Sequence, residues 1–571
     1  AVILAVGMVV DASVVVLENI SRKRDEEGLS PGDAAVAGAE EVRLPVLAGV
    51  ATTAVVLVPL LFTAGFVGKT FGPLSLTLLF AFTGSLLVAL ILVPVLSLWT
   101  GGNSRVDRLG MLVARPFQWL MDGVRTLYLA LLGGALSHRL LTIVVALAML
   151  GGGLALIRSQ GMEVMPKMDS GSFFISLETP SGTSLERTEG VIRQVEAILS
   201  KEPEVVKVQS QVGFEAGMRS FAASGAQGPT QGFISVTLTP RTERSDTIWD
   251  IEDRVRLQMA RVPGIRSHTV REMGNTAKAT TSAPIIVRLS GPDPLVLDRL
   301  GQDVLKRMAG VDSVAQPVRN WRIDQKRVRV HVDALRAGPL DLAPASVAMQ
   351  MQLGSVGVSA GDFYGRQSSP VPVWVRYGQP VGARPDQLLD YPVVARGGGT
   401  VPLRAVAQLE QTTDRSLVTR EDLTPTLEVS AFVQGRSLSF VIADVEKAMA
   451  GLTVPRGYEL SLTGENNDMA EVKGEMGGAL AISLIAVYLL LVAQLRSFVH
   501  PLTIMMSVPL SLIGVGVALW AGSKPISMPV MVGLILLVGT VVNNAIILLD
   551  FIRRQREEGA PLEQALLASV H

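Results

Sequence analysis

One carboxylate stands inside an otherwise apolar stretch near the start of the chain. The stretch GMVVDASVVVLENI (residues 7–20) carries Asp11, and no other charge occurs between Ala1 and Leu17. In a membrane helix such a charge costs roughly 2.5–3.5 kcal/mol, and residues of this kind usually face the bundle interior and take part in transport. Burial favours the neutral carboxyl, whereas a nearby polar or charged group favours the ionised form. The residue type and its setting therefore predict a proton-carrying group.

A second stretch, GTVVNNAIILLDFIRRQREEG (539–559), repeats the landmarks of the first. Asp11 aligns with Asn543, and the preceding glycine, the basic run and the acidic ending also correspond, apart from a slip of one residue. These shared landmarks indicate an internal duplication. Repeats in membrane proteins commonly place the functional centre at their interface near the midplane. We therefore expect Asp11, Asn543 and Asn544 to form a proton relay.

The elements that position these residues are expected to be membrane helices, each of which needs about 20 mostly apolar residues. Stretches of this kind lie near residues 1–20, 44–64, 74–99, 140–157, 477–495, 501–521 and 529–552. Alternate loops between them are rich in Lys and Arg, which marks the cytoplasmic side. The sequence thus predicts a multi-pass protein in a lipid bilayer, with residues 158–474 on the non-cytoplasmic side.

Two segments outside these spans have their own patterns. Residues 104–139 mix large apolar residues with spaced Arg, which indicates either an interfacial amphipathic helix or a cytoplasmic connector packed on the bundle. Residues 158–474 alternate short strands with amphipathic helices, which favours small α+β subdomains of split β-α-β type. We expect strands at 173–180, 232–240, 284–291 and 427–435, and helices at 184–200, 247–261 and 294–309.

Composition narrows the function classes. Of the 571 residues 48% are hydrophobic and only 18% charged, and the net charge is zero, so no global field favours nucleic acid. The sequence has no cysteine, its five histidines are scattered, and no phosphate loop, nucleophile elbow or metal-ligand spacing appears. We predict no enzyme, no metal site and no cofactor apart from protons as the coupling ion. The chain starts inside an apolar run without Met, and we interpret it as an internal fragment of a longer protein.

Several motifs together resemble the resistance–nodulation–division (RND) superfamily. GMVVDASVVVLENI is similar to its fourth transmembrane helix and VVNNAIILLDFI to its tenth. EVMPKMDSGSFFISLETPSGTSLERT (163–188), PRGYELSLTGEN (455–466) and LVAQLRSFVHPLTIMMSVPLSLIGV (491–515) resemble the start of the second periplasmic half, its end, and helices eight and nine. The resemblance implies a polytopic α-helical protein of the bacterial inner membrane with a large α+β periplasmic region.

By this resemblance the spans are helices four to ten of a duplicated full-length chain. The implied activity is proton-driven efflux by a homotrimer, joined to a periplasmic adaptor and an outer-membrane channel. The implied domains are transmembrane helices at 1–103, the connector at 104–139, a transmembrane helix at 140–157, porter subdomains at 158–334, a docking-like subdomain at 335–418, a porter return at 419–474, transmembrane helices at 475–552, and a cytoplasmic loop with the start of a further helix at 553–571.

The motif departs from the pattern of the drug-exporting branch at two positions. That pattern has a second acidic residue where this chain has Ala12, and a lysine where it has Asn543. The predicted relay therefore holds one ionisable group where the familiar one holds three, and these spans offer Asp11 no ion-pair partner. Metal exporters in the same superfamily also use a single Asp, so this departure does not argue against transport.

The expected substrates are small amphiphilic compounds. GFEAGMRSFAASGAQGPTQGF (213–233) is a Gly-, Ala- and Ser-rich loop with Phe214, Phe221 and Phe233 at intervals, which suits an adaptable apolar pocket. The resemblance implies a substrate-gating loop here, and the alternative is an ordinary surface loop with Phe233 in a core strand. A heavy-metal exporter and a non-exporting relative of similar fold are the competing functions.

Polar and small residues of the spans are expected to serve packing. Thr52, Thr53, Thr83 and Ser85 are predicted to hydrogen-bond between helices. Gly514 and Gly516 are predicted close-packing positions.

Overall fold

The structure is a computed structural model that describes most of the chain. It covers residues 2–571 except 101–104, 214–225, 227, 274–282, 356, 366–369, 377–384, 558, 560, 563, 565 and 567–571. The backbone alone is described for residues 2–6, 8, 9, 11, 100, 105–118, 385, 547, 550 and 554.

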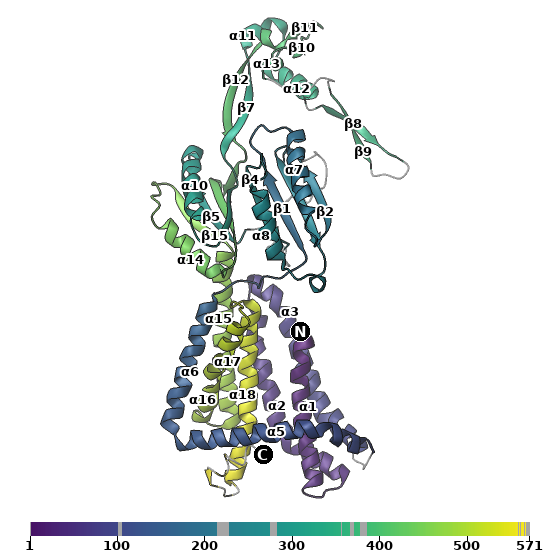
Figure 1. Cartoon of the computed structure of the whole chain (residues 1–571), viewed down its shortest axis with the longest axis vertical. Helices are drawn as coiled ribbons and strands as arrows, with labels where there is room; N and C mark the ends of the chain where they lie inside the picture. The colour runs from purple at the N-terminus through teal and green to yellow at the C-terminus, as the bar shows by residue number, and fades with distance from the viewer. Residues whose placement is uncertain are drawn as a thin grey trace.

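A bundle of long apolar helices forms one end of the molecule (Figure 1). Its elements are α1 (Val2–Asp25), α2 (Pro31–Leu61), α3 (Gly65–Leu87), a π-helical segment (Val88–Leu92), α4 (Val93–Thr100), α6 (Arg139–Gln160), α15 (Glu465–Leu495), α16 (Val499–Met505), α17 (Ser507–Ala521) and α18 (Met528–Glu557). Within the described residues, six helical stretches are long and apolar enough to cross a membrane, and they coincide with six of the predicted spans. The remaining predicted span coincides with α1, in which several side chains are not described. Long apolar runs form helices here because a helix satisfies its own backbone polar groups inside lipid.

Small residues let the helices of the bundle approach closely. A Cβ at Gly516 of α17 would lie 3.0 Å from the Cα of Gly153 in α6, and a Cβ at Gly38 of α2 would lie 2.8 Å from the Cα of Ile20 in α1. The predicted packing role of Gly516 is thus confirmed. That of Gly514 is wrong, since a Cβ there would meet nothing within 4 Å.

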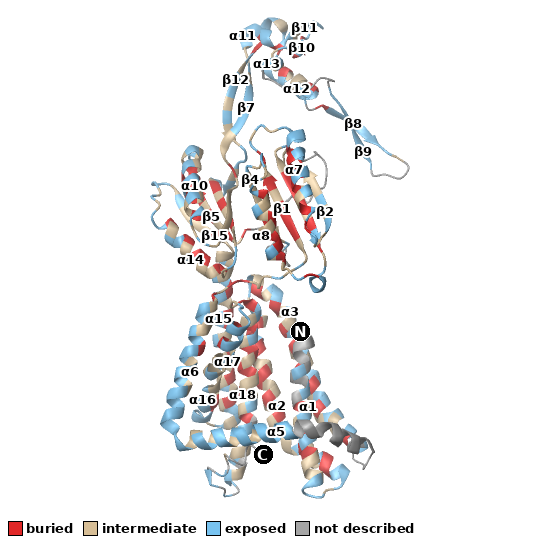
Figure 2. Cartoon of the chain, viewed as in Figure 1, coloured by how far each residue is buried: buried red, intermediate tan, exposed pale blue. Residues whose placement is uncertain are grey.

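Helix α5 (Arg105–Ser137) connects the two groups of spanning helices. It runs across the base of the bundle at a steep angle to the other helices (Figure 1), and its described side chains are mostly exposed (Figure 2). This orientation suits a helix that lies along a membrane surface.

The first sheet unit follows α6 and has β-α-β-β-α-β topology. Its four antiparallel strands have the order β2-β3-β1-β4, and both helices cover one face. This is the predicted split β-α-β arrangement. The elements are β1 (Ser172–Glu178), α7 (Leu185–Leu199), β2 (Val205–Val212), β3 (Gln231–Leu238), a 3-10 turn (Arg241–Glu243), α8 (Ile248–Met259) and β4 (Ser267–Glu272).

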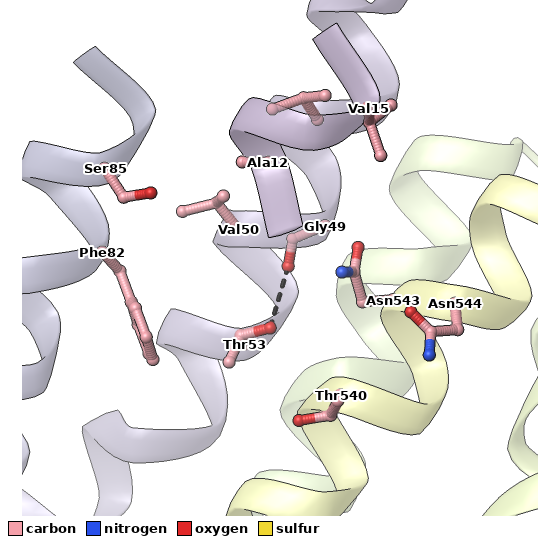
Figure 3. Close-up of a pocket in the computed structure, with 11 residues that line it drawn as sticks. Ala12, Val15, Gly49, Val50, Thr53, Phe82, Ser85, Thr540, Asn543 and Asn544 are labelled. Carbon is pink, nitrogen blue, oxygen red and sulfur yellow. Dashed lines mark hydrogen bonds between the residues drawn. The ribbon is translucent and has the colours of Figure 1, made fainter. Parts of the chain in front are cut away.

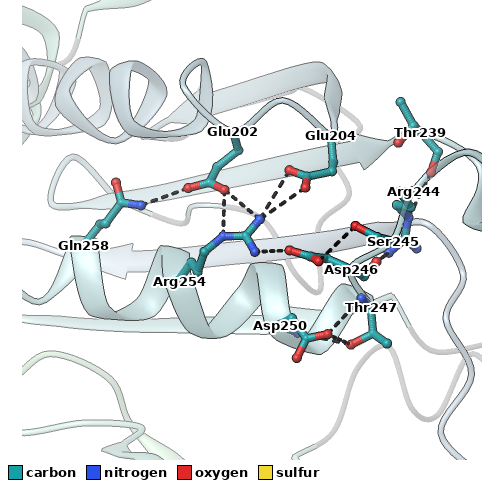
Figure 4. A network of polar contacts seen from close by, with 10 residues as sticks. All are labelled: Glu202, Glu204, Thr239, Arg244, Ser245, Asp246, Thr247, Asp250, Arg254 and Gln258. Atoms are coloured by element: carbon teal, nitrogen blue, oxygen red, sulfur yellow. Dashed lines mark hydrogen bonds and ion pairs between the residues drawn. The ribbon is translucent and has the colours of Figure 1, made fainter.

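Helix α8 is held firmly at its N-terminus and along one side (Figure 4). Thr247 and Asp250 form a capping box, which satisfies free backbone N–H groups of the first turn. Arg254 pairs with Asp246 and with Glu202 and Glu204, which lie before and at the entry to β2. These contacts fix α8 against the sheet.

The second sheet unit repeats the same topology. Strand β14 pairs with β5, β6 and β13, and β15 pairs with the other edge of β5, all antiparallel. The elements are β5 (Ile285–Ser290), α10 (Pro294–Ala309), β6 (Val314–Arg319), β13 (Thr419–Glu421), β14 (Thr424–Val433), α14 (Leu438–Met449) and β15 (Glu459–Gly464). Helix α15 starts directly after β15, so this unit is continuous with the bundle.

A distal unit is inserted between β6 and β14. The antiparallel ribbon of β7 and β12 leads to it, and the hairpin of β8 and β9 projects from it with mostly exposed side chains (Figures 1 and 2). The elements are β7 (Ile323–Val332), α11 (Ala334–Ala337), a 3-10 turn (Gly338–Leu340), α12 (Pro344–Ser355), β8 (Val358–Phe363), β9 (Val371–Val375), α13 (Pro385–Leu388), β10 (Pro392–Val394), β11 (Thr400–Pro402), a 3-10 turn (Leu403–Ala405) and β12 (Ala407–Arg415). A small core of its own includes Tyr391, Val393 and Leu403.

Candidate functional site

A pocket opens inside the bundle where four helices meet (Figure 3). Helices α1 and α18, which carry the two repeated stretches, both contribute to its wall, together with α2 and α3. The lining residues are Ala12, Val15, Val46, Gly49, Val50, Thr53, Phe82, Ser85, Thr540, Asn543 and Asn544.

Two of the three predicted relay residues line this pocket. Asn543 is half-buried and Asn544 is exposed, and neither amide hydrogen-bonds to a described residue. Asp11 belongs to α1 directly before the buried Ala12, but its side chain lies outside the described residues. The structure therefore brings Ala12 and Asn543, the two positions at which the chain departs from the drug-exporter pattern, to one pocket.

Three threonines of the spans make their hydrogen bonds within their own helices. Thr53 Oγ1 donates to the carbonyl of Gly49 at 3.1 Å, Thr52 Oγ1 donates to Ala48 at 2.8 Å, and Thr83 Oγ1 donates to Leu79 at 2.9 Å. The predicted hydrogen bonds between helices are thus wrong for the three threonines. A threonine in a helix reaches the carbonyl four residues earlier more easily than a neighbouring helix. The asparagine amides remain as polar groups directed at the pocket.

The absence of a side chain at Gly49 leaves room for the Asn543 amide. A Cβ at Gly49 would overlap Oδ1 of Asn543 and lie 2.8 Å from its Cγ, so the amide occupies the space that a side chain would take. One turn away the glycine lies on α18 and the larger residue on α2, because a Cβ at Gly539 would lie 3.0 Å from the Cα of Thr53. Two glycines therefore set the distance between α2 and α18. Sequence reasoning missed Gly49, since nothing in its own helix marks it.

A polar cluster joins the basic C-terminal end of α1 to the N-terminal half of α2. Asn19 is buried and donates to the carbonyl of Gly38 at 2.8 Å, and Glu41 pairs with Arg22 and Lys23, both at 3.1 Å. The cluster fixes the register of α1 against α2 below the pocket. It too was not predicted, although the polar Asn19 within an apolar helix is a signal of it.

The predicted gating residues separate into two groups. Phe214 and Phe221 lie outside the described residues. Phe233 lies in β3 with 7% of its surface exposed, and its ring packs on Phe174 of β1 with centroids 5.2 Å apart. Alternation along the strand places Phe233 on the sheet face opposite to Ile234, which packs under α7 and α8. That burial within a strand matches the alternative of a core position.

Comparison with known proteins identifies the family. A family model described as the AcrB/AcrD/AcrF family matches residues 1–571. The chain belongs to the AcrB/AcrD/AcrF family. Members of this family are RND transporters, multi-pass proteins of the bacterial inner membrane rather than enzymes, and the predicted family, fold class and location are confirmed.

Individual relatives of the AcrB/AcrD/AcrF family cover the chain almost completely. Multidrug resistance protein MdtC of Escherichia coli O139:H28 (strain E24377A / ETEC) is 27% identical over 569 residues, which is 98% of this chain and 53% of the relative. MdtC of Shigella flexneri gives the same values. The crystal structure of a heavy metal efflux pump superposes with a TM-score of 0.78 at 22% identity, covering 99% of this chain and 56% of the other, and shows the shared fold. The chain thus spans about half the length of these relatives.

Proposed function

We propose that this chain is part of a proton-driven exporter in which Asp11 carries the coupling proton and the pocket beside Asn543 is the relay site. Membership of an efflux-transporter family gives the class of activity. The observation that supports the relay is the pocket itself, which joins the two repeated helices and is lined by Asn543 and Asn544.

The position of Asp11 in α1 supports its role. Residues four apart share one face of a helix, so position 11 lies on the face of Val15, which lines the pocket. A carboxyl in this setting changes its preferred packing when it gains or loses a proton. A two-state bundle can couple such a change to transport.

The relay has an unusual composition under this proposal. Ala12 is buried at the position of the second acidic residue, and an amide replaces the lysine at Asn543. Asparagine can donate to a carboxylate and accept from a carboxylic acid, so one amide serves both protonation states of Asp11. The proton is then handled without an ion pair.

The proposed substrates are hydrophobic or amphiphilic compounds. The similarity to relatives named multidrug resistance proteins supports this class over heavy-metal cations. The proposed assembly is a homotrimer joined to a periplasmic adaptor and an outer-membrane channel. The gating role of the loop with Phe214 and Phe221 is part of the same proposal, in which Phe233 anchors the end of the loop in β3.

Transport in proteoliposomes under an imposed pH gradient tests the relay. Asp11→Asn in the full-length transporter should abolish coupled export and the accompanying proton flux. Glu18→Gln, which removes an exposed carboxylate from the same helix, is the matched control and should retain both. Export by the Asp11→Asn variant with unchanged pH dependence would show that Asp11 does not carry the proton. Efflux of metal cations but not of amphiphiles by the unmodified protein would contradict the proposed substrate class without contradicting the relay.

A further inference from the structure

Helix α8 contains a carboxyl group buried in the core of the first sheet unit. Glu252 is fully buried, among apolar neighbours that include Ile248, Ile251 and Val255. Its Oε2 accepts from Nη2 of Arg256 at 2.8 Å, whereas its Oε1 has no hydrogen-bond partner among the described residues. A buried carboxylate needs several donors to offset its lost hydration. The site therefore suits a neutral carboxyl better than a charged one.

Arg256, the partner of Glu252, also contacts two groups through which the first sheet unit meets the second. Arg256 pairs with Asp253, whose other oxygen accepts from Nε2 of Gln434, just after β14, at 2.6 Å. Arg256 Nη2 also donates to the carbonyl of Val270 in β4 at 2.7 Å, and the Val270 amide donates to Oε1 of Gln316 in β6 at 2.9 Å. One guanidinium thus links the buried carboxyl to the junction between the two sheets.

The charged groups around Glu252 come from α8 and β4. Asp253 and Arg256 lie on α8, and Glu272 and His268 lie on β4, while β1 and α7 add apolar side chains to this core. Burial, reinforced by the charge of Glu272, raises the pKa of Glu252 to about 8 against the opposing effect of Arg256. Burial and the neighbouring Arg256 lower the pKa of His268. At neutral pH the carboxyl keeps its proton, and one guanidinium contacts Glu252, Asp253 and the Val270 carbonyl at the same time.

We propose that Glu252 is a protonatable joint between the two sheet units. With its proton, Glu252 accepts one hydrogen bond from Arg256, which also holds Asp253 in place for Gln434. Without its proton, the buried charge draws Arg256 towards itself, because an unpaired buried charge is far more costly than an exposed one. Asp253 and the Val270 carbonyl then lose their partner, and the junction loosens.

The rest of α8 stays in place during this change. Arg254 and the capping box fix the helix from its other side (Figure 4), and among the described residues these groups pair within the first sheet unit. The movement is therefore confined to the junction. This junction lies in the extramembrane part of the chain and is independent of the relay proposed for Asp11.

Distance measurement between the two units tests the joint. The sequence has no cysteine, so Leu257→Cys on α8 and Lys447→Cys on α14 place spin labels at two exposed positions in the full-length transporter. Electron paramagnetic resonance should show one short-distance population at mildly acidic pH. A longer and broader population should replace it on raising the pH, with a midpoint near pH 8.

Three variants test whether Glu252 causes the change in distance. Glu252→Gln keeps the shape of the neutral acid and should hold the short distance at every pH. Gln434→Ala removes the junction contact without altering the buried core, and should show the long population even at acidic pH. Glu202→Gln removes a buried carboxylate that pairs with Arg254 on the other side of α8, and should leave the transition unchanged.

Two results would overturn the proposal: a distance that does not change with pH in the unmodified protein, or the same transition in the Glu252→Gln variant. If Glu252→Gln does not fold, Gln434→Ala decides alone. A Gln434→Ala distribution equal to that of the unmodified protein at acidic pH then contradicts the joint.

Discussion

Replacing Gly49 by alanine places a methyl group where the Asn543 amide lies. The added Cβ would overlap Oδ1 and lie 2.8 Å from Cγ, so the amide must leave its position. Separation of the helices would in turn disrupt the packing of Thr53 against Gly539, one turn away. Overpacking of this kind costs about 1–3 kcal/mol, and the better helix propensity of alanine returns up to about 1 kcal/mol. We expect a net loss of about 1–2 kcal/mol in stability.

Thermal unfolding in detergent and proton-coupled transport in proteoliposomes measure the two consequences of Gly49→Ala. Stability should fall, and coupling should fall with it because Asn543 is displaced from the relay. Gly533→Ala makes the same change on α18 at a site where a Cβ meets nothing within 4 Å, and should affect neither property. Adding Asn543→Ala to Gly49→Ala should restore stability but not coupling. Unchanged stability and full coupling in the Gly49→Ala variant would show that the Asn543 amide does not depend on the space left by Gly49.

Three further substitutions test the packing and charge of other regions. Burial raises the pKa of Glu163 above its unfolded value. The stability that Glu163 contributes is therefore complete below the unfolded pKa and is lost as the pH rises through the folded pKa. Glu163→Gln should reduce this pH-dependent loss of stability in unfolding experiments across a pH series. Ser483→Ala removes a buried hydrogen bond of 2.8 Å to the Val56 carbonyl, and thermal unfolding should show a loss of about 0.5–1.5 kcal/mol. Trp321→Phe leaves the Thr426 carbonyl without the indole donor at 2.7 Å, and denaturant titration should show a loss of about 1 kcal/mol, while an unchanged midpoint would contradict that role.

Much of the fold follows directly from sequence periodicity. The spanning helices could be predicted because apolar runs of that length have few other stable forms. The strands and helices of both sheet units could be predicted because one face of each is buried, as in α10, where Leu297, Leu300 and Val304 recur at helical spacing.

Contacts between distant segments could not be predicted in the same way. The closeness of Gly49 to Asn543 depends on which helices become neighbours, and a single sequence does not encode that as a local pattern. Glu252 did leave a signal, because it lies four residues after Ile248 and three before Val255, on the apolar stripe of α8. A charged residue at a core position of an amphipathic helix therefore deserves the same scrutiny as one in a membrane span.

The continuity of β15 with α15 gives the molecule a mechanical property. Thirty-one residues of helix measure about 46 Å, which exceeds a bilayer core of about 30 Å. The excess forms a rigid lever arm whose first amide, that of Glu465, is bonded to the Pro284 carbonyl at the base of β5. Further along, Glu475 accepts from the Ala64 amide at the start of α3 at 3.0 Å. A tilt of the second sheet unit would therefore displace α3, which lines the pocket. The size of this displacement depends on the point along α15 about which the helix tilts.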